Sequence, residues 1–150
     1  MDEREFQQVR EHLSQRPCPY QKAILSGLCR CRKCQRLNIA EREMVDCISP
    51  IAHGCCVKVL EQLSQKARFA IKQVRSPLSH IQAMKVQCGG LIGLQSLLIS
   101  GNTCEIKSIK NIDALVTQAL EVFGNMENFP YQEIVRFISH YQVRVKRVHH

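Results

Sequence analysis

Seven of the nine cysteines of this chain fall between residues 18 and 56, and three of them stand within six residues. Residues 29–34 read Cys-Arg-Cys-Arg-Lys-Cys, and cations beside a thiol favour its thiolate form. The pair Cys31-x-x-Cys34 has a spacing that is common among the ligands of structural zinc. Because thiolates also hold iron–sulfur clusters, the run predicts zinc or an iron–sulfur cluster, and the sequence does not distinguish the two.

Two ligand sets are compatible with the positions of the thiols. The first consists of Cys29, Cys31 and Cys34 with a fourth ligand from elsewhere in the chain. The second consists of Cys18, Cys47 and Cys56, and its fourth ligand is His53, Cys55 or Cys88. An intact helix between Cys18 and Cys29 would hold the two sets about 15 Å apart. Unwinding at Ser26-Gly27 would allow them to merge.

Some of these residues also have a purely structural interpretation. Cys47 and Cys56 lie on expected apolar faces, where a free cysteine packs as a small hydrophobic residue. Cys88 and Cys104, taken singly, are expected as core or surface thiols, and a single histidine such as His53 is more often a helix residue than a ligand. The predicted metal ligands are therefore Cys18, Cys29, Cys31, Cys34, Cys47 and Cys56.

Apolar residues recur at helical spacing along most of the chain, which predicts the elements that hold these thiols. Helices are expected over residues 2–15, 19–28, about 35–47, 50 to about 74, 77–100, 111–123 and from about 130 onward. Ser49-Pro50 is a typical helix start, and Asn111 is a typical cap. Gly89-Gly90 must serve a turn or a close backbone contact. The predicted fold class is all-α, an irregular bundle of six to eight helices with a cysteine-rich N-terminal half.

The length and composition of the chain favour one globular domain over residues 1–150. The chain has 150 residues, of which 45% are hydrophobic, enough to form a core without disulfides. Within this domain, residues 1–100 are expected to form a cysteine-bearing core. Residues 111–150 are expected to form a C-terminal helical pair followed by a basic tail, in which residues 143–148 alternate apolar and basic side chains.

The distribution of charge indicates which kinds of partner the protein could meet. The net charge is +8, and no acidic residue occurs between Glu61 and Glu105. Arg68, Lys72 and Arg75 fall within this span, on one face of the expected helix, and could contact nucleic-acid phosphates. A basic surface also suits an acidic protein.

The ends and apolar runs of the chain predict a cytoplasmic location. The first five residues, Met-Asp-Glu-Arg-Glu, do not resemble a signal peptide. The longest apolar run, residues 91–99, is too short to cross a bilayer, so no membrane association is expected. In a reducing compartment the cysteines are not expected to form a disulfide framework, which favours metal or redox roles.

The sequence favours a small metal- or iron–sulfur-binding helical protein that acts as a non-catalytic accessory, electron-transfer or sensing module. Its expected partner is another protein, and its oligomeric state is left open. One alternative is a basic nucleic-acid-binding regulator with a structural zinc. A second alternative is a thiol-redox protein that uses Cys31 and Cys34. An enzyme is not favoured, because no catalytic triad, carboxylate pair or nucleotide motif is recognisable.

Overall fold

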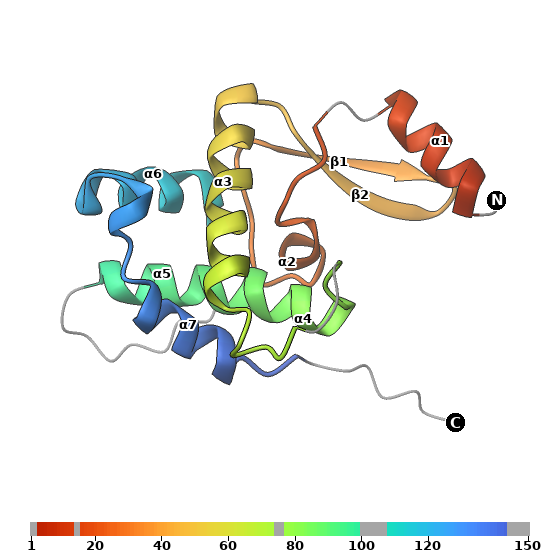
Figure 1. The fold of residues 1–150 in the computed structure, drawn as a ribbon. Helices are drawn as coiled ribbons and strands as arrows, with labels where there is room; N and C mark the ends of the chain where they lie inside the picture. The colour runs from red at the N-terminus through yellow and green to blue at the C-terminus, as the bar shows by residue number, and fades with distance from the viewer. Residues whose placement is uncertain (1–2, 14–15, 74–76, 100–107, 144–150) are drawn as a thin grey trace.

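The structure is a computed structural model that describes residues 3–13, 16–73, 77–99 and 108–143. The helices in these ranges are α1 (Glu3–Leu13), α2 (Gln21–Leu25), α3 (Pro50–Lys66), α4 (His80–Met84), α5 (Gly90–Leu98), α6 (Ile112–Phe123) and α7 (Tyr131–His140). A π-helical segment, η1 (Lys85–Gly89), joins α4 to α5, and a 3-10 turn, η2 (Met126–Asn128), precedes α7. Two strands, β1 (Cys34–Ile39) and β2 (Arg42–Cys47), form an antiparallel hairpin (Figure 1).

The hairpin shows that the predicted all-α fold class is wrong, because the fold is mixed α/β. The helix expected over residues 35–47 is replaced by β1 and β2, whose register places Leu37 opposite Met44. In this register Leu37, Ile39 and Met44 share one face of the hairpin. Phe6 of α1 packs against Ile39 and Met44 in a small hydrophobic cluster of its own. Leu37 and Met44, which fit one face of the helix expected here, therefore also fit one face of a hairpin.

The turn of the hairpin has a backbone conformation that its residues rarely adopt. Ala40 and Glu41 have φ angles of +49° and +69°. Positive φ at both central residues is the requirement of the type I′ turn that usually carries Asn-Gly. Since Ala and Glu give no signal for such a turn, the sequence contained no local indication that the chain reverses here.

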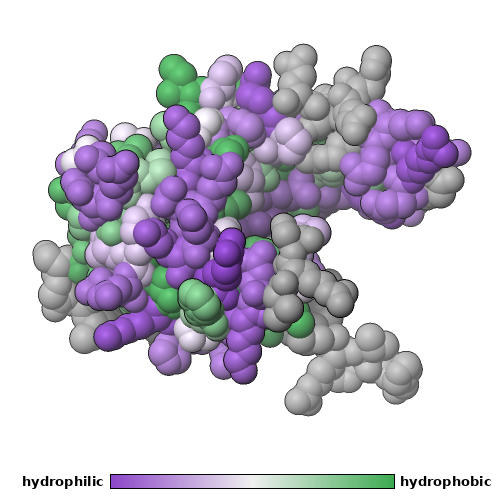
Figure 2. All heavy atoms as spheres, in the orientation of Figure 1, coloured by the Kyte–Doolittle hydropathy of each residue, from purple (hydrophilic) through white to green (hydrophobic). Residues whose placement is uncertain are grey.

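The main hydrophobic core lies between the base of the hairpin, α2, α3, α5, α6 and α7. Leu63 of α3, Leu91 of α5 and Ile138 of α7 are all fully buried in it. In Figure 1, α3 runs through the middle of the molecule, and α1 with the tip of the hairpin extends from it as an arm. Figure 2 shows hydrophilic residues along the exposed side of α3 and over most of this arm. In the described part of the chain, none of the helices combines the length and apolar character needed to span a bilayer.

Two helices near the cysteines are shorter than predicted. Helix α2 covers only Gln21–Leu25 instead of residues 19–28, and Gly27 follows it with a φ of +88°. Helix α3 ends at Lys66 instead of near residue 74, so Arg68 and Lys72 lie in turns and not on a common helix face. Arg75, Cys104 and most of the basic tail (residues 144–148) lie outside the described residues.

Candidate functional site

Five cysteines from separate parts of the chain line one small cavity of about 20 Å³. They are Cys18 ahead of α2, Cys31 in the turn before β1, Cys34 at the start of β1, Cys47 at the end of β2, and Cys56 on α3. The lining also includes Lys33, Tyr20, His53 and Asp113. The fold thus brings part of the first predicted ligand set next to the second, as unwinding after α2 would allow.

Pairing of the backbone at the base of the hairpin positions three of these thiols. Cys34 and Cys47 are directly opposite one another in the two strands. The segment ahead of α2 runs along the outer edge of β2. There the N–H of Cys18 donates to the carbonyl of Val45 at 2.9 Å, and the N–H of Cys47 donates to the carbonyl of Arg16 at 2.8 Å. Cys18 is therefore fixed beside the strand that carries Cys47.

Cys31 is held by a tight turn that is attached to the start of α6. The N–H of Cys34 donates to the carbonyl of Cys31 at 3.3 Å, which closes the turn. The N–H of Arg32 donates to the side-chain oxygen of Asn111 at 3.1 Å. Asn111 precedes α6, and Asp113 in the first turn of that helix lines the cavity. The predicted Cys-x-x-Cys pair thus occupies a turn with defined partners.

Helix α3 supplies Cys56 and His53, which face the cavity one turn apart. The hydroxyl of Ser49 accepts the N–H of Ala52 at 3.2 Å, so the helix begins at the Ser49-Pro50 start predicted from the sequence. The Nε2 of His53 lies 3.0 Å from the carbonyl oxygen of Pro17. When this nitrogen is protonated it donates to that carbonyl, so His53 fastens the Cys18 segment and is not free to act as a ligand through Nε2.

Burial keeps two of the cavity thiols protonated at neutral pH. It raises the pKa of Cys18 to about 12, with smaller contributions from the neighbouring Cys31, Cys47 and Cys34. It also raises the pKa of Cys56 to about 12, with a smaller contribution from Cys18 among others. The folded protein holds these protons more tightly than the unfolded chain does. The raised pKa values therefore stabilise the folded state. This stabilisation is fully present below about pH 8.5, the pKa of a thiol in the unfolded chain, and is lost as the pH rises toward 12.

Tyr20 places a buried phenol beside these thiols. Its side chain is fully buried, and its hydroxyl makes no hydrogen bond to any residue that the structure describes. The pKa of Tyr20 is raised well above its usual value by burial first, and then by Cys56 and Cys18, which line the same cavity. A buried hydroxyl without a partner costs about 1–3 kcal/mol. A thiolate in the cavity would be an acceptor for it.

Cys29 and Cys88 lie apart from the cavity. Both are fully buried, and neither lines it. The pKa of Cys29 is raised by burial, and next by Cys88 and Cys18, and both Cys29 and Cys88 belong to the main core. The side chain of Cys88 is hydrogen-bonded to Ser26 and Tyr141. Cys29, although close in sequence to Cys31, is therefore not brought together with Cys31 and Cys34, and Cys55 on α3 does not line the cavity either.

The thiols line one cavity, but they do not form a preformed metal site. Among the described residues, no group of three or more His, Cys, Asp or Glu side chains stands ready to hold a metal ion. One reason is that some of these side chains bond to backbone carbonyls. The thiol of Cys47 donates to the carbonyl of Ser49 at 3.3 Å, and His53 bonds to Pro17. Ligation would require the thiols to rotate from such contacts into the cavity.

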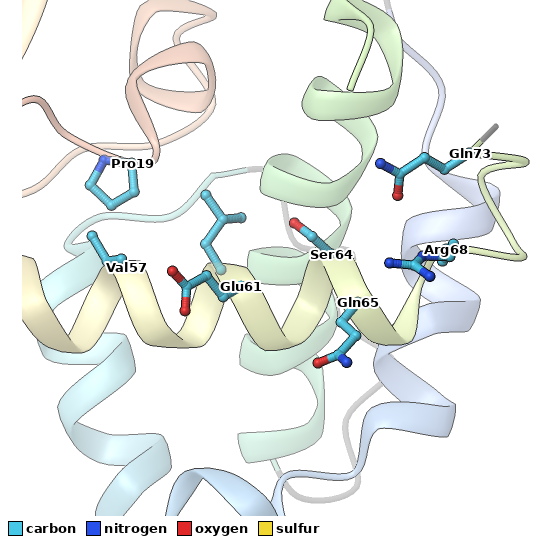
Figure 3. Close-up of a pocket in the computed structure, with 8 residues that line it drawn as sticks. Pro19, Val57, Glu61, Ser64, Gln65, Arg68 and Gln73 are labelled. Atoms are coloured by element: carbon cyan, nitrogen blue, oxygen red, sulfur yellow. The ribbon is translucent and has the colours of Figure 1, made fainter. Parts of the chain in front are cut away.

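A second, wider hollow of about 450 Å³ runs along the exposed side of α3. Figure 3 shows Pro19 and Val57 at one end of it, and Ser64, Arg68 and Gln73 toward the other. No cysteine lines it, and Glu61 shares it with Arg68. Because an acidic side chain lines the same hollow as Arg68, this part of the surface is not uniformly cationic.

Tyr20 and Asp113 were not identified as site residues from the sequence. Asp113 follows Cys31 by more than eighty positions, and no motif links the two. Tyr20 is close to Cys18 in sequence, but an aromatic residue there is equally compatible with ordinary core packing. Compared with known protein families, curated proteins and solved structures, the chain matches none, so the chemistry of the cavity is argued from its own residues.

Proposed function

We propose that the protein binds a single zinc ion through Cys18, Cys31, Cys34 and Cys47 and acts as a non-catalytic accessory or sensing module. The observation that carries this proposal is the convergence of five thiols from separate segments on one cavity. Four thiolates satisfy the tetrahedral coordination of a structural zinc. A site closed by four protein ligands leaves no open position for a substrate, which is why a non-catalytic role is favoured.

The size of the cavity favours one ion over a cluster. The cavity of about 20 Å³ leaves little space between the side chains that line it. A single metal ion fits this space after small rotations of the thiols. An iron–sulfur cluster contains several metal and sulfide atoms, so it would require the surrounding segments to move apart.

The choice of four ligands follows from how the thiols are grouped. Cys31, Cys34 and Cys47 are at the base of the hairpin, and the hydrogen bond from the Cys18 N–H to the Val45 carbonyl holds Cys18 beside the strand that carries Cys47. Cys56 lies on α3 and lines the same cavity. Lys33 also lines it, and its cation would offset part of the negative charge of four thiolates.

Metal analysis of protein purified without oxygen tests the proposal. We expect about one zinc per chain, no absorption near 400 nm of the kind that iron–sulfur clusters give, and loss of the zinc in Cys34→Ser. Cys55→Ser is the matched control, because Cys55 neighbours Cys56 on α3 but does not line the cavity. Protein that carries neither zinc nor iron, or equal zinc in both variants, would refute the proposal. Iron with sulfide would favour the cluster instead.

Tyr20→Phe is expected to raise the stability of the metal-free protein and to lower its affinity for zinc. Removing a buried hydroxyl that has no partner among the described residues should stabilise the metal-free protein by about 1–3 kcal/mol. If the hydroxyl donates to a zinc-bound thiolate, the same variant should bind zinc about 10–100-fold more weakly, as is usual when an outer hydrogen bond to a ligand is lost. Competition with a zinc-binding dye measures the affinity, and urea unfolding measures the stability. Unchanged zinc affinity would show that the Tyr20 hydroxyl makes no hydrogen bond to a zinc-bound thiolate.

A further inference from the structure

The pairing of β1 and β2 gives Cys34 and Cys47 a specific relative geometry. They are opposite one another, so their side chains lie on the same face of the hairpin. The N–H of Ile48 donates to the carbonyl of Lys33 at 2.8 Å, so Lys33 and Ile48, the next pair away from the turn of the hairpin, are a hydrogen-bonded pair. The N–H of Cys47 points away from β1, toward the carbonyl of Arg16. Because the two kinds of pair alternate in antiparallel strands, Cys34 and Cys47 form a non-hydrogen-bonded pair.

This kind of pair brings two cysteines within the range of a disulfide. The Cα atoms of a non-hydrogen-bonded pair are about 4.5 Å apart. Disulfides span Cα separations of about 4.4–6.8 Å, so the bond requires side-chain rotation without movement of the strands. The rotation breaks only the weak hydrogen bond from the Cys47 thiol to the Ser49 carbonyl. Both cysteines are partly exposed, so a small oxidant can reach them.

We propose that Cys34 and Cys47 are a disulfide-forming modification site that responds to a peroxide. This assignment differs from oxidation within the Cys31-x-x-Cys34 pair. Cys31 and Cys34 are the ends of a hydrogen-bonded four-residue turn, whose Cα atoms are less than about 7 Å apart, a range that includes the separations of disulfides, so the test must distinguish the two pairs. The cross-strand pair lies inside that range and is held there by the hairpin on both sides.

The reaction uses two thiols and one peroxide molecule. The thiolate of one cysteine attacks a peroxide oxygen, the O–O bond breaks, and the departing hydroxide takes up a proton to leave as water. The resulting sulfenic acid is then attacked by the second thiolate. An S–S bond forms, the S–O bond breaks, and the hydroxyl leaves as a second water. Two sulfur atoms are oxidised and the peroxide is reduced to two waters.

The disulfide would also control the zinc site. Because Cys34 and Cys47 are two of the four proposed ligands, their oxidation would remove half of the coordination and release the ion. This consequence rests on the proposed function, whereas the disulfide itself does not. The test is therefore carried out on metal-free, reduced protein.

Peptide mapping after peroxide treatment identifies the bond. Metal-free protein is treated with one equivalent of hydrogen peroxide, its remaining thiols are alkylated, and it is digested with trypsin. Cleavage after Arg and Lys leaves Cys34 in residues 34–36, Cys47 in residues 43–58 and Cys31 in a separate fragment. We expect residues 34–36 to be linked to residues 43–58. Fragmentation should locate the bond at Cys47 and not at Cys55 or Cys56.

Matched variants make the assignment independent of fragmentation. The linked peptide should be lost in Cys47→Ser and retained in Cys55→Ser. A link between Cys31 and Cys34, a linked peptide that survives Cys47→Ser, or no link at all would overturn the inference. Zinc uptake without this disulfide overturns the inference alone, while the disulfide in a protein that takes up no zinc overturns the proposed function alone.

Discussion

Gly89→Ala is expected to lower the free energy of unfolding by about 1–3 kcal/mol, the usual cost of inserting a methyl group into a closely packed core. A Cβ on Gly89 would lie 2.7 Å from the Cα of Ile138 and 2.9 Å from the carbonyl oxygen of Phe137. Both are backbone atoms of α7, so no side-chain rotation can relieve the contact. The substitution must move α7 away from η1, which also loosens the buried side chain of Ile138.

Gly54→Ala is the matched control for this substitution. Gly54 lies within α3, and a Cβ there would meet no atom within 4 Å. Alanine is about 1 kcal/mol more favourable than glycine inside a helix, so this variant should be more stable than the original protein. Urea unfolding followed by circular dichroism measures both. Equal stability of the two variants would show that the approach of η1 to α7 is not close in solution.

Local signals in the sequence predicted several helices well. The start of α3 at Ser49-Pro50 is confirmed, as is the start of α6 after Asn111. Gly89 was expected to serve a turn or a close backbone contact, and it lies against the backbone of α7. For the two helix starts the information is contained in one or two neighbouring residues, whereas the partner of Gly89 is set by the packing of α7.

The hairpin could not be predicted in the same way. Leu37 and Met44 are seven positions apart in sequence, which fits two turns of a helix, and they are also opposite one another across the strands. The turn residues Ala40 and Glu41 gave no hairpin signal. Phe6 of α1 covers the face of the hairpin that carries Ile39 and Met44, and this long-range contact is absent from any local window of sequence.

The grouping of the thiols was only partly foreseen for the same reason. The sequence identified Cys18, Cys47 and Cys56 as one set and Cys31 and Cys34 as part of another. Their convergence on one cavity depends on the hairpin, whose pairing brings residue 34 opposite residue 47. With a helix over this stretch, the two ends would have been separated by about 20 Å.

Zinc is expected to raise the melting temperature of the metal-free protein by about 8–16 °C at a free concentration of 1,000 times its dissociation constant. At that concentration a ligand that binds only the folded state stabilises it by about 4 kcal/mol. Each kcal/mol shifts the melting temperature of a chain of this size by about 2–4 °C. Zinc should bind only the folded state, because the four proposed ligands come from the segment ahead of α2, the turn before β1 and both strands, which unfolding separates.

Thermal unfolding of reduced protein with zinc, or with a chelator, measures this shift. In Cys34→Ser the shift should disappear, because three thiolates and a hydroxyl bind zinc much more weakly than four thiolates. In Cys55→Ser it should persist in full, since Cys55 does not line the cavity. A shift that survives in Cys34→Ser would mean that zinc binds elsewhere on the chain. If neither the original protein nor Cys55→Ser responds to zinc, the cavity thiols do not bind this metal. The disulfide between Cys34 and Cys47 would then be the remaining role proposed for them.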